Sequence, residues 1–312
     1  MFRQKSLLKP LIELITATAF WGASFPCTVL LLRQLDTAAF TFYRFNIFAA
    51  GGLILYAFRL APSPEAASSA PPQISFWVEF KNEITLALPS GVWLFLTIVL
   101  QAWGMLTTTA TKSAFLTILY VIIIPIITTL TGQERLGRNH FLSVLLALVG
   151  ISVFQNLQIS NWSRGDTITL GGAVAASFHI LSVGRAAAIS RNPFLFNIGQ
   201  ALWSASFSLF LFPFTARWDI FSLNAEGFSA LAILGLGSGL VAFYLQIRAQ
   251  ERIPPSLAGM LFLLECPFSA LIAFWVLREN IESHHLWGGA LILTACAWAC
   301  RSVETLWEEE IE

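Results

Sequence analysis

The sequence predicts an all-α integral membrane protein with ten transmembrane helices, arranged as two inverted five-helix repeats. Hydrophobic residues make up 56% of the 312 residues and charged residues only 12%, whereas a soluble domain has about 25% charged residues. The mean hydropathy is +0.70. The chain also divides into about ten apolar stretches, most of which approach the roughly 20 residues that cross a bilayer.

These apolar stretches define the expected spans and the connections between them. The first follows Pro10; it is too long for the apolar core of a signal peptide and lacks a clear cleavage site, so we expect it to be retained. One connection is long: residues 59–83 are rich in Ala, Pro and Ser and predict a flexible cytoplasmic loop. The expected spans are residues 11–32, 37–58, 84–105, 113–131, 140–157, 167–184, 194–213, 228–247, 256–277 and 286–300.

The charges of the connections predict the orientation. With the N-terminus in the cytoplasm, most Lys and Arg residues outside the spans fall on the cytoplasmic side, as the positive-inside rule requires. Both termini are then cytoplasmic, and we expect a multi-pass protein of a bacterial inner membrane. The net charge of zero gives no electrostatic footprint for nucleic acid. The expected partners are the lipid bilayer, a small-molecule substrate and, with proton coupling, protons; the chain would be a monomer or homodimer.

The number of spans predicts two repeats. Five spans in each half make the second half enter the membrane from the opposite side, which is the inverted-repeat layout of many secondary transporters. We expect the repeats at residues 1–158 and 159–312. Weak echoes relate the halves, because the fourth span contains Ala114 and Pro125 and the ninth contains Ala258 and Pro267.

Short motifs recur in order through both halves, over roughly residues 11–300. They are Trp21-Gly22-Ala23-Ser24-Phe25, Tyr43-Arg44-Phe45, residues 111–117 with Tyr120 and Pro125, Gly165-Asp166, Gln246 with Gln250, Leu264-Glu265-Cys266-Pro267 and Gly288-Gly289-Ala290. With these motifs the chain resembles the drug/metabolite transporter superfamily, in particular the EamA-type ten-helix carriers. This resemblance implies two inverted repeats around a central cavity and transport of small organic solutes by alternating access.

Glu265 is the leading candidate for a functional residue. It lies near the centre of the apolar stretch 256–277, where a carboxylate costs about 2.5–3.5 kcal/mol on insertion scales. Ionisable groups at that depth tend to face a bundle interior or a water-filled path. We therefore predict that Glu265 binds the substrate or gains and loses the proton that is coupled to transport. A protonated acid hydrogen-bonded to a neighbouring helix is the alternative.

Two prolines predict bent helices around this acid. A proline within a helix cannot donate to the carbonyl four residues before it, so Pro267 would leave the Leu263 carbonyl free and Pro125 the Val121 carbonyl. Broken helices at the membrane midplane commonly mark the binding site of a transporter. An ordinary proline kink is the alternative.

Further polar and aromatic residues within the spans are candidates for the cavity wall. Arg44 would meet an anionic group of the substrate or pair with Glu265, unless it extends to the interface. His179 would relay protons or simply pack. The full set of candidate substrate-binding or coupling residues is Glu265, Tyr120, Gln246, His179, Arg44, Trp103 and Trp21.

Other functions remain open at this stage. An energy-independent facilitator of the same solutes has the same sequence features. Gly237-Ser238-Gly239 also suggests an intramembrane serine hydrolase with His179 as its base, although the run Gly235 to Gly239 is more typical of close helix approach. The four cysteines show no metal-ligand spacing, and we expect no metal or other cofactor. Amino acids, metabolites or drugs are the expected solutes.

Overall fold

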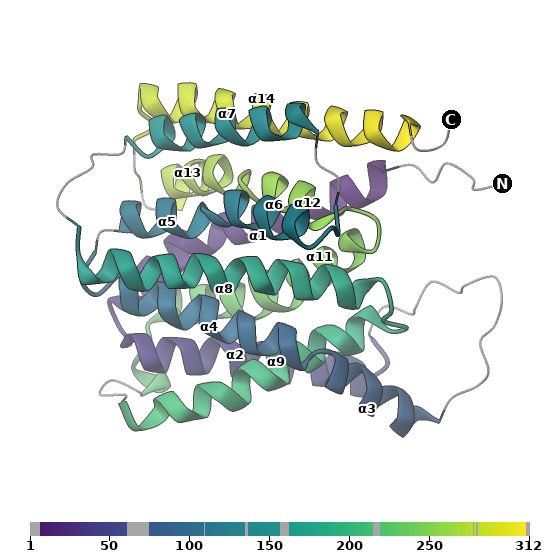
Figure 1. Ribbon diagram of the computed structural model, residues 1–312. Coiled ribbons are helices and arrows are strands. Elements are labelled where there is room, and N and C mark those ends of the chain that lie inside the picture. Colours follow the sequence, from purple (N-terminus) through teal and green to yellow (C-terminus); the bar gives the residue numbers. More distant parts are fainter. Residues whose placement is uncertain are drawn as a thin grey trace.

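The computed structural model describes residues 7–60, 75–108, 110–134, 137–156, 162–214, 219–276, 278 and 280–309. Within these ranges the protein is all-helical and contains no β-strand (Figure 1). The α-helices are α1 (Leu8–Leu32), α2 (Thr37–Ala57), α3 (Phe76–Leu86), α4 (Leu88–Gly104), α5 (Ala110–Ile118), α6 (Tyr120–Leu130), α7 (Arg138–Phe154), α8 (Arg164–Ala187), α9 (Pro193–Ser208), α10 (Ala225–Ala232), α11 (Ala242–Gln250), α12 (Pro255–Phe262), α13 (Glu265–Val276) and α14 (Ser283–Glu309). Two short 3₁₀ helices, η1 (Leu209–Phe214) and η2 (Ile220–Ser222), and one π-helix, η3 (Ile233–Val241), complete the fold.

Seven helical segments of the described chain are long and apolar enough to cross a membrane. An eighth candidate is the pair α3 and α4, which bends by 43°. The protein is therefore a multi-pass integral membrane protein. The seven candidates other than this bent pair are Leu8–Leu32, Thr37–Ala57, Lys112–Leu130, Arg164–Ala187, Pro193–Leu211, Ala225–Gln250 and Pro255–Val276.

The predicted flexible loop over residues 59–83 is too long at its C-terminal end. Helix α3 begins at Phe76, and residues 61–74 lie outside the described ranges. Glu83, which is buried, accepts hydrogen bonds from the Ser190 hydroxyl and the Arg191 backbone N–H, both at 2.8 Å. The polar composition of this stretch suggests a loop, but its acids in fact anchor α3 to the connection between α8 and α9.

Two of the candidate spans are interrupted near their centres. Helix α5 ends at Ile118 and α6 begins at Tyr120; α12 ends at Phe262 and α13 begins at Glu265. Pro125 lies inside α6, whereas Pro267 lies in the first turn of α13, where a missing N–H is tolerated. Both prolines thus follow a break, as expected for bent helices.

The expected free carbonyl at Leu263 is not observed. The Cys266 N–H donates to the Leu263 oxygen at 3.1 Å, and the Leu263 N–H donates to the Met260 oxygen at 3.2 Å. These three-residue spacings are those of a 3₁₀ turn. The chain tightens at the break and satisfies this carbonyl within its own turn.

Close helix approaches hold the interrupted spans in place. A Cβ atom built on Gly22 of α1 would lie 2.6 Å from the Phe268 Cβ of α13, so the two helices pack with almost no space between them. The glycine run in η3 approaches α2 in the same way, since Gly235 faces Ile47 and Gly239 faces Phe48. This packing confirms that the run serves close helix approach. Helices α7 and α14 pair along one side of the bundle (Figure 1).

Candidate functional site

A cavity of about 530 Å³ lies within the helix bundle, a volume suited to a small organic ligand. Its wall contains residues from both halves of the sequence, from α1, α2, α4, α5 and α6 of the first half and from α8, α11, α12 and α13 of the second. Tyr120 and Glu265, the first residues after the two helix interruptions, both line it. The polar residues of the wall are Ser24, Thr28, Arg33, Arg44, Thr97, Gln101, Ser113, Thr117, Tyr120, His179, Gln246, Glu265 and Ser269.

The cavity brings together most of the candidate residues. Those that line it are Trp21, Arg44, Tyr120, His179, Gln246 and Glu265. Trp103 does not line it and is 38% exposed. Its neighbour Gly104 occupies the buried face of α4, where an added Cβ would lie 2.1 Å from the Thr169 hydroxyl oxygen of α8. Because consecutive helical residues point in different directions, Trp103 lies off this face. Pro125 and Pro267 do not line the cavity.

Glu265 faces the cavity as the first residue of α13. Its side chain is half-buried, and within the described chain its carboxylate makes no hydrogen bond and no ion pair. The Tyr120 hydroxyl lies close enough to interact electrostatically with it. An acid that held two helices together would be bonded to a neighbouring helix, and this one is not. Its carboxylate oxygens are therefore available to a group in the cavity.

An aromatic wall stands beside the acid. Trp21 packs against Phe243 with ring centroids 5.3 Å apart and against the edge of Phe262 at 5.0 Å. Its indole N–H donates to the Ser238 carbonyl oxygen at 3.1 Å. This bond fixes the ring, so the cavity has a rigid apolar surface next to Glu265.

His179 belongs to a buried hydrogen-bond chain. Its Nε2 lies 3.2 Å from Gln200 Oε1, and Gln200 Nε2 donates to Asn197 Oδ1 at 2.8 Å. Asn197 Nδ2 in turn donates to the Leu240 carbonyl oxygen at 2.8 Å. Asn197 carries no sequence signal, because its importance depends on contacts between α8, α9 and η3.

Gln246 belongs to a second chain. Its Nε2 donates to Gln250 Oε1 at 2.8 Å, and Gln250 Nε2 donates to the Ile180 carbonyl oxygen at 3.1 Å. Gln246 is 1% exposed. Its Oε1 has no hydrogen-bond partner among the described residues. A buried acceptor without a partner is costly, so this oxygen marks a place where a ligand donor would be favoured.

Arg44 is buried in α2, with its guanidinium 6.0 Å from the centre of the Phe40 ring. It lines the cavity together with Arg33, which follows the end of α1. The pairing with Glu265 that the sequence allows is not formed in the described chain. The cavity thus contains a buried cation and a carboxylate that do not neutralise each other.

The arrangement required for a serine hydrolase is absent from this part of the structure. The Ser238 hydroxyl donates to the Phe20 carbonyl oxygen at 2.9 Å, while the described bond of His179 goes to Gln200. A serine nucleophile needs a base within hydrogen-bond reach. Ser238 therefore serves the packing of η3 on α1.

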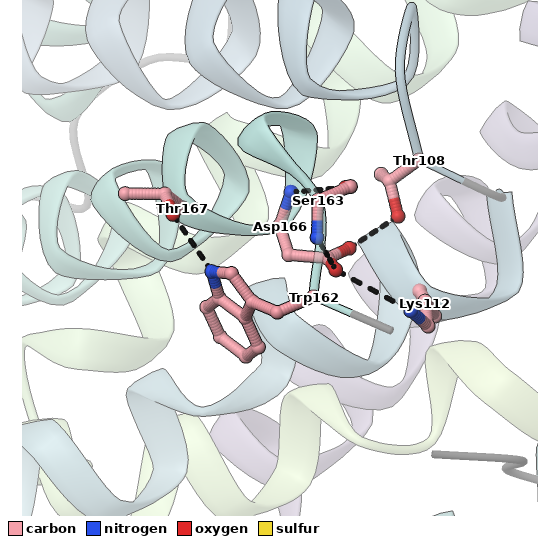
Figure 2. Close-up of polar contacts among 6 residues, drawn as sticks. All are labelled: Thr108, Lys112, Trp162, Ser163, Asp166 and Thr167. Atoms are coloured by element: carbon pink, nitrogen blue, oxygen red, sulfur yellow. Dashed lines mark hydrogen bonds and ion pairs between the residues drawn. The ribbon is translucent and has the colours of Figure 1, made fainter. Parts of the chain in front are cut away.

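Asp166 fixes the start of the first interrupted span (Figure 2). Ser163 caps α8, and the Asp166 carboxylate accepts the Ser163 N–H at 2.8 Å in a capping box. The same carboxylate accepts a hydrogen bond from the Thr108 hydroxyl and lies 3.3 Å from Lys112 Nζ (Figure 2). The sequence motif Gly165-Asp166 points to this residue without predicting its capping role, which the Ser-x-x-Asp spacing could have revealed.

Glu134 has the corresponding role at the start of the second interrupted span. Its Oε1 accepts the Ser256 backbone N–H at 3.3 Å, and the Ser256 and Thr128 hydroxyls lie 3.2 Å apart. Its Oε2 is buried without a partner in the described chain. Burial raises the pKa of the Glu134 carboxyl, and the hydrogen bonds from Ser256 oppose this only in part.

Comparison with known proteins identifies the family. The model of the EamA-like transporter family matches residues 8–155 and 163–300. The chain belongs to this family. The predicted resemblance to the drug/metabolite transporter superfamily is therefore confirmed, and the protein is a transporter.

Two proteins that are named as transporters are similar to this chain in sequence. This EamA-like transporter is 28% identical over 287 residues to an uncharacterized transporter of Archaeoglobus fulgidus, covering 91% of this chain and 83% of the relative. It is 25% identical over 230 residues to the uncharacterized transporter YetK of Bacillus subtilis, covering 68% and 66%. A solved crystal structure matches with a TM-score of 0.74 and 18% identity, covering 95% of this chain and 98% of that one, which shows a common fold.

Proposed function

We propose that this EamA-like transporter is a secondary carrier that moves small organic solutes through the central cavity by alternating access, with Glu265 as the acid that binds the solute or a coupled proton. One observation carries the proposal. The carboxylate of Glu265 faces a cavity of ligand size and has no partner in the described chain. Ionisable groups within a membrane commonly mark the path of a substrate or ion.

The proposed architecture has ten spans in two inverted repeats. The eight candidate spans become ten when α7, a shorter apolar helix, and its partner α14 are included. Two separate matches to the family model, over residues 8–155 and 163–300, support a repeat in each half. The occurrence in each half of a span that is interrupted beside the cavity, at Tyr120 and at Glu265, also favours this arrangement. The loop charges support cytoplasmic placement of both termini, and we propose a bacterial inner membrane as the location.

Flux measurements in proteoliposomes test this function. A panel of radiolabelled amino acids, nucleosides and amines is offered to the purified protein with and without a pH gradient. A carrier shows saturable uptake that is accelerated by unlabelled solute on the opposite side, whereas a channel shows no such acceleration. Uptake that follows the pH gradient supports proton coupling. Saturable uptake that ignores the gradient identifies a facilitator instead.

A further inference from the structure

The two hydrogen-bond chains beside the cavity determine which polar atoms face a ligand. Each chain ends on a backbone carbonyl oxygen, and such an oxygen can only accept a hydrogen bond. The orientation of every amide along each chain follows from that end point. The atoms left over at the cavity are therefore fixed by the chemistry of the chains.

The first chain determines the tautomer of His179. The Leu240 oxygen requires a donor, so Asn197 presents Nδ2 to it and Oδ1 to Gln200. Gln200 must then donate through Nε2, which leaves its Oε1 facing His179 Nε2. His179 Nε2 is consequently the protonated nitrogen. In a neutral imidazole the other nitrogen, Nδ1, is an acceptor, and the ring lines the cavity.

The second chain determines the orientation of Gln246. The Ile180 oxygen requires a donor, so Gln250 presents Nε2 to it and Oε1 to Gln246. Gln246 must then donate through Nε2. Its Oε1 remains as a buried acceptor without a partner in the described chain.

These two acceptors belong to residues that line the cavity together with Glu265, whose carboxylate, when it is ionised, can only accept hydrogen bonds. The positively charged groups are displaced along the cavity. Arg33 follows Trp21 by twelve helical residues, about 18 Å, and Arg44 neighbours Cys27, which is six residues, about 9 Å, from Trp21. The region beside the aromatic wall therefore combines these three acceptors with the Tyr120 hydroxyl, which can donate or accept a hydrogen bond.

We propose that His179, Gln246 and Glu265 form a subsite for a protonated primary amine of the substrate, whose apolar part packs on Trp21, Phe243 and Phe262. This inference rests on the proposed function, because it assigns the solute class to the same cavity. A primary ammonium carries three N–H donors, one for each acceptor. A carboxylate carries none and would meet the charge of Glu265, and a quaternary ammonium carries the charge without the donors. Gln250 is a positioning residue, since it only orients Gln246.

Binding of matched probes to the purified full-length protein tests this subsite without requiring transport. The probes are 2-phenylethylamine, its N,N,N-trimethyl derivative and 3-phenylpropionate, which share the aromatic body and differ in the head group. Calorimetry and ligand-dependent thermal unfolding in detergent measure their affinities. We expect the primary amine to bind at least about tenfold more tightly than either analogue, because each loses hydrogen bonds to buried acceptors.

Three variants test which side chains cause the preference for the primary amine. Gln246→Leu removes one of the three acceptors and is expected to lower the preference for the primary amine over its trimethyl derivative by about threefold or more, while the discrimination against the carboxylate, which depends on Glu265, persists. Gln250→Leu should weaken the preference less. Gln133→Leu makes the same change at an amide that contacts Arg185 outside the cavity, and should keep the preference intact. If Gln246→Leu does not fold, the affinities of the three probes for the wild-type protein still test the proposed subsite.

Wild-type protein that binds the carboxylate or the quaternary ammonium as tightly as the amine overturns the proposal, as does absence of amine binding at millimolar concentration. Saturable flux of panel solutes without an amine preference refutes the subsite and leaves the carrier function standing. Selective amine binding without flux of any panel solute supports the subsite and counts against the carrier.

Discussion

The two interrupted spans share a backbone design and differ in chemistry. In both, a helix stops near the middle of the span, a second helix begins with a residue that lines the cavity, and a proline follows. Helix α6 begins with Tyr120, a phenol that is 5% exposed. Helix α13 begins with Glu265, a half-buried acid. Both breaks place a residue on the cavity wall, and only the second span places a carboxylic acid there.

The spans also differ in how their N-terminal ends are held. Asp166 holds the first through Thr108 and Lys112, and all these groups are satisfied. Glu134 holds the second through the Ser256 N–H and keeps one unpartnered oxygen in the described chain. The first anchor is therefore expected to be the stronger one.

Replacing the two residues that follow the breaks should give the largest contrast. Glu265→Gln removes a charge-assisted contact, worth about 1.5–3 kcal/mol, and should lower apparent solute affinity by about 10- to 150-fold. Tyr120→Phe removes at most a neutral hydrogen bond and should change it by less than about tenfold. Uptake rates against solute concentration measure both. If both substitutions lower the apparent solute affinity equally, Glu265 and Tyr120 contribute equally to binding and the two spans do not differ in chemistry.

Asp166→Asn should destabilise the protein by about 1.5–3 kcal/mol, because the capping box and the Lys112 ion pair both lose the carboxylate charge. Thermal unfolding of the purified protein in detergent measures this. Asp219→Asn, which alters the cap of the short helix η2, is a suitable control and should cost less. If Asp166→Asn unfolds at the same temperature as the wild-type protein, the Asp166 carboxylate does not stabilise the start of the first interrupted span.

Gly22→Ala should cost about 1–3 kcal/mol, since the new Cβ is forced against the backbone of α13 and the structure must shift. Gly171→Ala is the matched control in α8, where the nearest atom to the new Cβ is Leu100 Cδ1 at 3.7 Å. That change should be tolerated or mildly stabilising. Tolerance of both would mean that close packing does not fix the position of Glu265.

The smallest expected effect is a pH dependence of protein stability that arises from Glu134. Burial raises the pKa of its carboxyl above the usual 4.5, so the folded state binds its proton more tightly than the unfolded state does. The resulting stabilisation is complete below the pKa that Glu134 has in the unfolded state. It is lost as the pH rises through the pKa of Glu134 in the folded state. Glu134→Gln should therefore gain stability relative to wild type as pH rises. Unfolding temperatures measured from pH 4 to pH 8 check this; a constant difference would contradict it.

Much of the fold is predictable from sequence, and the site only partly so. Apolar length and loop charge predict a membrane helix bundle, and a midplane acid points to Glu265 because burying it is costly. The position of Trp103 outside the cavity wall is not predictable, since both Trp103 and Gly104 suit an apolar helix and only packing on α8 selects Gly104 for the buried face. The structured end of the 59–83 stretch depends on Glu83 and a loop over a hundred residues away. The amide chains through Asn197 and Gln250 likewise exist only in the folded bundle.

Carbodiimide modification of Glu265, followed by mass spectrometry, tests the central claim most directly. The reagent dicyclohexylcarbodiimide reacts with accessible protonated carboxyls in membranes, and Glu83, whose carboxylate is buried under three donors, is an internal control. We predict that Glu265 is modified, that Glu83 is not, and that a transported solute slows the modification of Glu265. Modification of Glu265 at a rate unaffected by saturating transported solute would contradict its place in the binding cavity.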